Sequence, residues 1–336
     1  DYTYPVAISV NGPIGGMEYP MICFNGPRPE KDGTYSARTK YGLISVIIHE
    51  VGHNYFPMII NSDERQWSWM DEGLNTFCQY LAEREWDEKY PSSRGEARSI
   101  IPYMSSDQAT LEPIMTNSES IQQFGNNAYG KPAAALNILR ETIMGRTLFD
   151  DAFKIYSNRW AYKHPQPADF FRTMEDASGV DLDWFWRGWF YTTEAVDQDL
   201  SKVRIASVPT LDPTELEAQR KAEATEDYQN FIGNQRNATS NRPTKVDKDP
   251  AYRDFYVTEY NRHAVSKADA KRLAGLKPGP QGYLHEVTVK NVGGLIMPVV
   301  VRYTFADGTS HVERWPAEIW IQSEQEFTKT VFLPKK

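Results

Sequence analysis

Cysteine and histidine are scarce in this sequence. Its 336 residues include only two cysteines, Cys23 and Cys78, and six histidines. Two cysteines do not settle the redox compartment of a protein. Cys78 falls on the apolar face of an expected helix, where a free buried thiol is favoured over a disulfide. No internal repeat is found either, so we expect neither a disulfide nor a repeat architecture.

Basic charge and long apolar runs are lacking as well. The net charge is −8 at pH 7, and no stripe of lysine and arginine runs along the chain. Both observations argue against a phosphate-binding surface. The longest apolar stretches, such as residues 46–48, are far shorter than the roughly 20 residues that span a bilayer. We therefore expect no nucleic-acid partner and no transmembrane segment.

Two histidines four residues apart are the most informative feature of the chain. His49 and His53 enclose Glu50 within residues 41–56, which predict a helix because apolar residues recur around it. Positions i and i+4 lie on the same helix face, so both imidazoles can bind one metal ion. Glu50 lies about 100° round the helix from His49, so it borders the metal without having to bind it.

Glu72 is the best candidate for a third ligand. It begins a second helical run, residues 71–83, in which apolar positions recur at helical spacing. Catalytic zinc keeps three protein ligands and leaves the fourth position for water, and two histidines with one glutamate form the thermolysin-type set. An isolated pair of spaced histidines also arises by chance. The added glutamate favours a site for one Zn²⁺ per chain, although other divalent metals could occupy it.

Three segments together resemble one family. Residues 49–56 followed by 69–77 read much like the paired zinc helices of the gluzincin aminopeptidases, the group of alanyl aminopeptidase and leukotriene hydrolase. Residues 15–19, Gly-Gly-Met-Glu-Tyr, look like the family's Gly-x-Met-Glu-Asn segment. Tyr129 lies before an Ala/Leu-rich helix, where the family places a catalytic tyrosine. The three segments occur in the family's order, so the resemblance implies a zinc aminopeptidase.

The resemblance also implies a role for each residue. Glu50 would accept a proton from a zinc-activated water and pass it to the leaving amine. Tyr129 would donate a hydrogen bond to the oxyanion, although Tyr103 and other tyrosines compete for that role. Glu18 would bind the free ammonium group of a peptide substrate, within the segment that also contains Gly15, Gly16 and Met17. Such an anchor would fix the first peptide bond over the zinc.

The sequence departs from the family pattern at two places. Tyr19 stands where the family has asparagine, and Pro57 follows Phe56 where a glycine is usual. Neither change removes a ligand or the base. The identity of residue 19 leaves the side-chain preference at the first substrate position open.

Two other functions are left open. The first is a thermolysin-like peptidase that cleaves internal bonds; the amine anchor at Glu18 argues against it, and a substrate with a blocked amino terminus would discriminate. The second is a non-catalytic adaptor that kept the fold. Such a protein should lack a ligand or the base, whereas His49, Glu50, His53 and Glu72 are all present.

The pattern along the chain predicts an α+β protein. Residues 1–198 should form a thermolysin-like catalytic domain with a small sheet followed by helices, 199–280 a polar linker with a helical insert at 256–276, and 281–336 an Ig-like β-sandwich. We expect helices at 132–144, 148–159, 168–177 and 181–191, and strands at 286–289, 299–305, 318–321 and 327–332, with a turn at 307–309.

The chain begins abruptly, without an initiator Met or an apolar leader. Members of the resembled family carry a large β-domain before this point, which also helps to close the active site. We therefore expect a truncated chain whose partners are the missing N-terminal β-domain and peptides with a free N-terminus. We expect it to be soluble; a periplasmic or secreted location stays open because any targeting signal would be missing.

Overall fold

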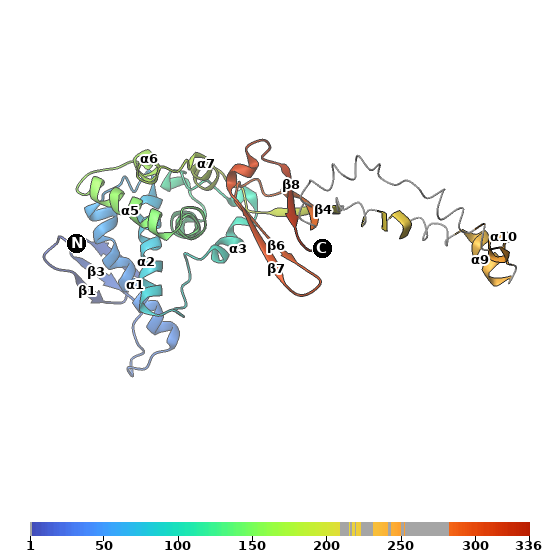
Figure 1. Cartoon of the computed structure of the whole chain (residues 1–336). Helices are drawn as coiled ribbons and strands as arrows, with labels where there is room; N and C mark the ends of the chain where they lie inside the picture. Colours follow the sequence, from blue (N-terminus) through green and yellow to red (C-terminus); the bar gives the residue numbers. More distant parts are fainter. Residues whose placement is uncertain are drawn as a thin grey trace. The chain divides into compact units, whose positions relative to one another are not determined.

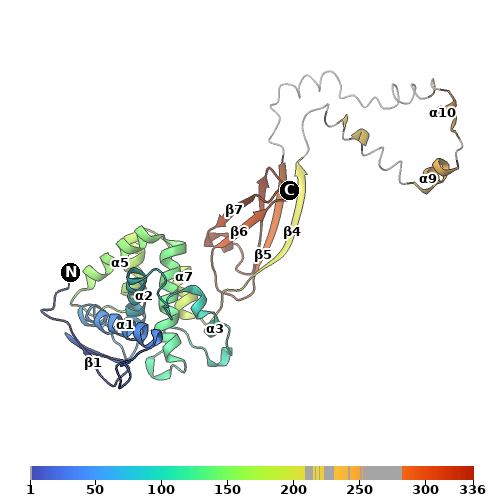
Figure 2. The ribbon, with the colours of Figure 1, turned by 90° about the horizontal axis from the view of Figure 1, so that it is seen from below.

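The computed structural model of the chain (Figures 1 and 2) describes residues 2–208, 231–240, 243–249 and 282–336, together with residues 215, 217–218, 220–222 and 252. The helix expected at 256–276 lies outside the described residues. Among the described residues, no helix has the length and apolar content that a membrane crossing needs.

The first 25 residues contain a three-stranded sheet, the small sheet expected at the start of residues 1–198. Its strands are β1 (Ile8–Asn11), β2 (Gly16–Tyr19) and β3 (Ile22–Asn25), in the order β1-β3-β2. Strand β1 is parallel to β3, and β2 is antiparallel to it, with Glu18 opposite Cys23. Strands β2 and β3 contact helix α1 (Ala37–Gly52), so this small sheet covers one side of that helix.

Helix α1 begins at a polar cap and ends earlier than the sequence predicts. Ser36 caps it by accepting a hydrogen bond from the backbone nitrogen of Thr39 at 3.1 Å. The expected helix runs to Phe56, but α1 ends at Gly52 and continues into a π-type segment, η1 (Asn54–Ile59). Phe56 has φ −124° and ψ 108°, because a residue before proline is driven out of the helical region.

The second expected helix, residues 71–83, consists of a π-helical turn, η2 (Trp69–Gly73), and helix α2 (Leu74–Trp86). Helices α1 and α2 lie side by side (Figures 1 and 2). They approach closely at Gly52, where an added Cβ would lie 2.2 Å from Oδ1 of Asn75. The Asn75 side chain in turn donates a hydrogen bond of 2.8 Å to the carbonyl oxygen of His49.

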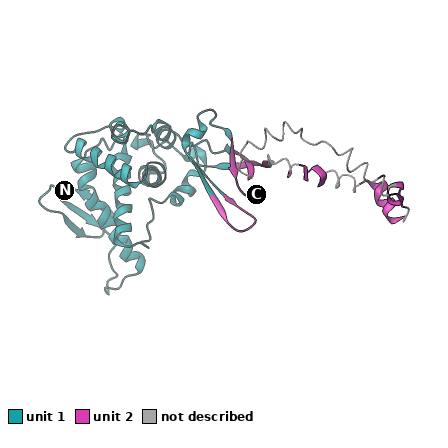
Figure 3. Cartoon of the chain, viewed as in Figure 1, with its two compact units in different colours: residues 1–199, 289–302, 312–327 teal, residues 200–288, 303–311, 328–336 magenta. Residues whose placement is uncertain are grey.

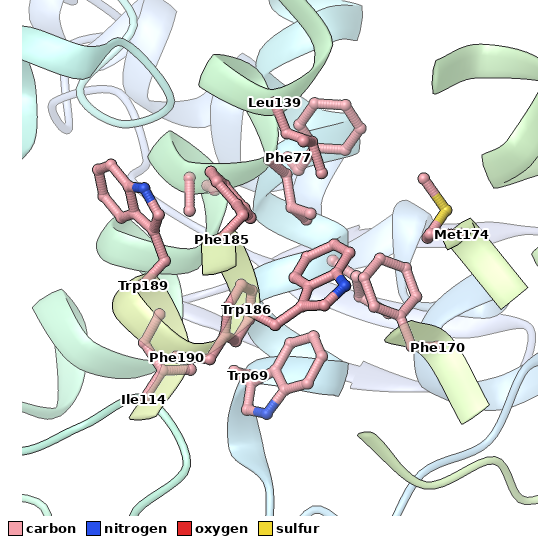
Figure 4. Packing of buried hydrophobic residues seen from close by; sticks show 14 of the residues in the cluster. Trp69, Phe77, Ile114, Leu139, Phe170, Met174, Phe185, Trp186, Trp189 and Phe190 are labelled. Carbon is pink, nitrogen blue, oxygen red and sulfur yellow. The ribbon is translucent and has the colours of Figure 1, made fainter. Parts of the chain in front are cut away.

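The remaining helices follow the expected ranges closely, apart from a short helix at residues 101–104 that was not predicted. They are α3 (Ile101–Met104), α4 (Lys131–Ile138) with its continuation η7 (Leu139–Ile143), α5 (Arg146–Trp160), α6 (Pro167–Ser178) and α7 (Asp183–Tyr191). A turn, η6 (Gly125–Gly130), precedes α4. Buried side chains of these helices, together with those of η2, form one aromatic-rich core, shown in Figure 4, which includes Trp69, Phe170 and Phe185. This core supports the far side of α2 and η2.

The C-terminal part is mainly β-structure. Strands β4 (Gln198–Val208), β5 (Gly282–Asn291) and β8 (Glu326–Leu333) form one sheet, and β6 (Val299–Thr304) pairs with β7 (Ser310–Trp315). The expected turn at 307–309 joins β6 to β7, with Gly308 at φ 81°. Two short helices, α9 (Ile232–Thr239) and α10 (Lys245–Lys248), lie between β4 and β5 in the sequence.

The prediction of a strand at residues 318–321 is wrong. Residues Ala317–Trp320 form a 3₁₀ turn, η9. Its Trp320 is buried, packs against Phe327, and donates a hydrogen bond of 2.8 Å from its indole nitrogen to the carbonyl oxygen of Met297. A buried indole N–H needs a hydrogen-bond acceptor, and the turn that provides one is favoured here over the strand that the local β-propensity predicts.

The chain divides into two compact units (Figure 3). One comprises residues 1–199, 289–302 and 312–327, and the other comprises 200–288, 303–311 and 328–336. The residues of strands β4 to β8 are therefore distributed over both units. The domain boundaries at 198 and 280 stay a prediction.

Replacing Gly52 should destabilise the protein by separating the paired helices. In Gly52→Ala the new Cβ displaces the buried Asn75 amide, and overpacking of this kind costs about 1–3 kcal/mol. We expect the free energy of unfolding, measured by urea denaturation, to fall by that amount. Gly42→Ala is the matched control on the same helix, because its Cβ would lie at an ordinary 3.6 Å from Pro27. Equal stability of the two variants would contradict the account.

Candidate metal centre

The structure brings His49, His53 and Glu72 together at the junction of α1 and η2. The Nε2 atoms of the two histidines lie 3.0 Å apart. Glu72 Oε2 lies 3.1 Å from Nε2 of His49 and 3.4 Å from Nε2 of His53. Donors bound tetrahedrally at 2.0–2.1 Å from one ion would be about 3.3 Å apart. The three atoms therefore have the separations that a zinc ion requires.

The other imidazole nitrogens are held by acceptors that turn both Nε2 atoms toward Glu72. Nδ1 of His49 lies 2.9 Å from Oε1 of Gln79. Nδ1 of His53 lies 2.8 Å from the carbonyl oxygen of Phe56 and 2.9 Å from Oδ1 of Asp71. With the proton on Nδ1, the Nε2 lone pair is free to bind a metal. The early end of α1 is what exposes the Phe56 carbonyl to His53.

The centre has a strongly negative potential. Burial disfavours the charged form of His53, but hydrogen bonds and charges from Asp71 and Glu72 outweigh burial and raise its pKa to about 11. Burial alone would raise the pKa of Glu72, yet its hydrogen bonds with the two histidines hold that pKa well below its usual value. Carboxylates that stabilise a proton on His53 offer the same field to a divalent cation.

Glu50 lies beside the three donors without joining them. Its side chain is buried, and among the described residues its Oε2 has no hydrogen-bond partner. Burial, followed by the charges of Glu18 and Glu72, raises the Glu50 pKa to about 7, with His53 opposing. Strand β2 passes so close that a Cβ on Gly16 would lie 2.1 Å from Oε1 of Glu50. The glycine therefore allows the carboxylate to occupy this position.

Tyr129 lies in η6 with its ring stacked on the imidazole of His49, 5.7 Å between centroids. Burial, and then the charge and hydrogen bond of Glu72, raise the pKa of Tyr129 well above its usual value, so its hydroxyl keeps its proton. Tyr103 belongs to the hydrophobic core, with its hydroxyl 3.5 Å from the carbonyl oxygen of Glu112. Of the two tyrosines, only Tyr129 borders the three donors.

Strand β2 places Glu18 beside Glu50 and His53. A carboxylate oxygen of Glu18 lies within 4.8 Å of ligand atoms of both Glu50 and His53. Gly16 shares the face of Glu18, because alternate residues of a strand point the same way, whereas Met17 is 36% exposed. Gly15 precedes the strand and accepts a backbone hydrogen bond from Gly26 at 2.9 Å. Glu18 and Gly16 thus border the centre directly.

Two hollows adjoin the centre. The larger, of about 870 Å³, is lined by His49, Glu50, Tyr129 and the N-terminal half of α1. The smaller, of about 320 Å³, is lined by Glu18, Glu72 and further acidic residues. His49 and Glu72, two of the three clustered residues, therefore each line a different hollow.

Several residues of the site were not identified from the sequence. Gln79 lies seven residues after Glu72, two helical turns along, so helical spacing could have found it. Asp71 precedes Glu72 directly, and its contact with His53 depends on how η2 meets α1. Arg94 reaches the centre from a loop after α2, and no local pattern marks it. Cys23 and Cys78 are free, as expected.

This chain is similar in sequence to known peptidases. Residues 5–189 match the model of the peptidase family M1 domain. Probable aminopeptidase 2 of Sulfurisphaera tokodaii is 27% identical over 185 residues, which is 52% of this chain and 23% of that protein. Glutamyl aminopeptidase of Bitis rhinoceros is 24% identical over 196 residues, 55% of this chain and 20% of that protein. The chain thus spans less than a quarter of the length of either relative.

A solved structure shows the same fold. Aminopeptidase A of Legionella pneumophila, in complex with aspartic acid, superposes with a TM-score of 0.54 and 12% sequence identity. The superposition covers 98% of this chain and 29% of that protein. It confirms the expected α+β fold class.

Removing the Glu72 carboxylate should empty the centre. We expect elemental analysis to find about one zinc per chain in the unmodified protein and little in Glu72→Ala, because two ligands do not complete the three-residue set. Glu119→Ala is the matched control, since Glu119 lines the smaller hollow and pairs with Arg65 but is not one of the three donors. Equal zinc content in Glu72→Ala and the control would rule out Glu72 as a ligand.

Proposed function

Because the chain belongs to peptidase family M1, whose domain model it matches over residues 5–189, we propose that it is a zinc-dependent aminopeptidase. It would hydrolyse the first peptide bond of peptides that have a free amino terminus, with one Zn²⁺ per chain. The resemblance to gluzincin aminopeptidases is thereby confirmed at the level of the family. The observation that carries the proposed activity is the position of Glu18 and Glu50 beside the cluster of His49, His53 and Glu72.

Zinc held by His49, His53 and Glu72 would activate a water molecule and polarise the scissile carbonyl. Glu50 would accept a proton from the attacking water and return it to the leaving amine. Two features support this role: its Oε2 is free of partners among the described residues, and one of its carboxylate oxygens lies within 4.8 Å of a ring nitrogen of His53. A positioned carboxylate of this kind contributes about 10²–10⁴-fold to the rate.

Tyr129 stabilises the oxyanion that forms on the attacked carbonyl. Its hydroxyl remains protonated and can therefore donate a hydrogen bond. Its ring contacts the imidazole of His49, with 5.7 Å between the ring centroids, and the guanidinium of Arg94, whose carbon is 4.4 Å from the Tyr129 centroid. A donor fixed in this way requires little reorganisation during the reaction, which is the condition for effective oxyanion stabilisation.

Glu18 binds the substrate's ammonium group and so selects the first peptide bond. The smaller hollow beside it is lined by four other carboxylates, and its one arginine, Arg65, is paired with Glu119. A negative hollow attracts a cation. An internal peptide segment would instead place an uncharged amide beside Glu18 and leave its carboxylate without a charge partner. This difference favours an aminopeptidase over an endopeptidase.

The base can be tested separately from the metal. Glu50→Gln keeps the size of the side chain but removes its ability to accept the proton, so we expect kcat to fall by about 10²–10⁴-fold. Zinc content should remain that of the unmodified protein, because Glu50 is not one of the three donors. Full activity in Glu50→Gln would exclude it as the general base, and loss of zinc would show that it serves the metal instead.

The amine anchor can be tested with blocked substrates. We expect a peptide with a free amino terminus to be cleaved and its N-acetylated form to remain intact. Glu18→Gln should lower kcat/KM for the free peptide by about 10- to 100-fold, the contribution of a charge-assisted hydrogen bond. Met17→Leu is the control from the opposite face of β2, and its kcat/KM should be unchanged. Equal cleavage of acetylated and free peptides would point to an endopeptidase.

A further inference from the structure

Arg94 lines the larger hollow beside Tyr129. It follows α2 on a loop, its side chain is half-buried, and its guanidinium carbon is 4.4 Å from the ring centroid of Tyr129. Among the described residues, no carboxylate pairs with it. Glu72 attracts it through space, but the Glu72 carboxylate is already bonded to the two histidines. The guanidinium therefore has donors available toward the hollow that it lines.

We propose that Arg94 binds a carboxylate of the substrate on the leaving-group side of the scissile bond. This inference rests on the proposed aminopeptidase function and specifies its substrate class. The carboxylate has two sources: the C-terminus of a short peptide, or an acidic side chain soon after the scissile bond. Arg94 would then be a specificity-determining residue, in addition to its contact with Tyr129.

The charges of the two hollows support a peptide orientation with the amino terminus at Glu18 and the following residues near Arg94. The smaller hollow contains Glu18 and Glu72 and is lined mainly by carboxylates. The larger hollow contains Arg38 and Arg94, and Glu50 is the one carboxylate in its lining. The centre lies between them, because His49 and Glu50 line one hollow and Glu72 lines the other. A peptide with its ammonium at Glu18 therefore extends its following residues toward positive charge.

The energetics of a half-buried arginine also favour a carboxylate ligand for Arg94. Removing a guanidinium from water without an anion costs free energy, which the Tyr129 ring offsets only in part. A guanidinium presents its donors as a planar fork that matches a carboxylate in two-point contact. The hollow of about 870 Å³ falls within the range of about 300–1,000 Å³ that is usual for small-ligand sites. It suits a short peptide rather than a folded partner.

The test compares matched peptides on the full zinc-loaded chain. A tripeptide with a free C-terminus is compared with its C-terminal amide, and an amide with Asp after the scissile bond is compared with the same amide with Asn. We expect a carboxylate in at least one pair to lower KM by about 10- to 100-fold. The pair that responds identifies the source of the carboxylate.

Variants then assign the effect to Arg94. Arg94→Gln should abolish the carboxylate preference, and Arg94→Lys should keep part of it because the charge remains without the fork. Arg98→Gln is the matched control, since Arg98 is exposed, pairs with Glu96 and does not line the hollow. A fall in kcat that is equal for acid and amide substrates would overturn the inference and leave Arg94 as a positioning residue for Tyr129.

Failure of the inference is distinguishable from failure of the proposed function. Equal KM for acid and amide peptides, with both cleaved, would overturn the role of Arg94 and leave the aminopeptidase standing. If no peptide is cleaved, calorimetric titration of the zinc-loaded chain with the same peptides tests the role of Arg94 by binding alone. Tighter binding of the acid form, lost in Arg94→Gln, would support the inference, whereas no binding of either form would overturn both proposals.

Discussion

The close approach of α1 to α2 is the contact on which the centre depends. Gly52 leaves space for the Asn75 side chain, which bonds to the His49 carbonyl and holds the end of α1 against the start of α2. Because α2 continues from η2, the same contact sets the distance between Glu72 and the two histidines. A separation of about 3 Å between side-chain donors thus follows from backbone packing, supported from behind by the aromatic core.

Concentrating carboxylates at this junction has a large electrostatic cost. Glu50, Asp71 and Glu72 lie within one small region, and burial raises the pKa of Glu50 and of Asp71. Such a cluster is unfavourable unless a proton or a cation balances it. The protein therefore uses folding energy, derived from its apolar core, to maintain a site that favours a divalent metal. Such a trade-off is expected, because a functional site is not optimised for stability and the surrounding scaffold must supply it.

In the proposed function, strand β2 would link the electrostatics of the centre to the choice of substrate. Its glycine at position 16 lets the backbone pass against Glu50, and the next residue on that face, Glu18, then reaches the same space. Acidic charge gathers on one side of the centre, while Arg94 and Arg38 lie on the other. The direction in which a peptide binds would follow from this asymmetry, independently of any pocket for a particular side chain.

The sequence by itself determined the elements and the residue spacings whose signals are local. Helical spacing placed His49 and His53 on one face, and the helices of residues 131–191 lie close to their expected ranges. Prediction from the sequence failed where a residue distant in the chain decided the conformation. At Trp320, the buried indole donates a hydrogen bond to the carbonyl oxygen of Met297. Only the tertiary structure placed Asp71 against His53 and Arg94 against Tyr129. Periodicity describes one element at a time, whereas these contacts arise from the packing of separate elements.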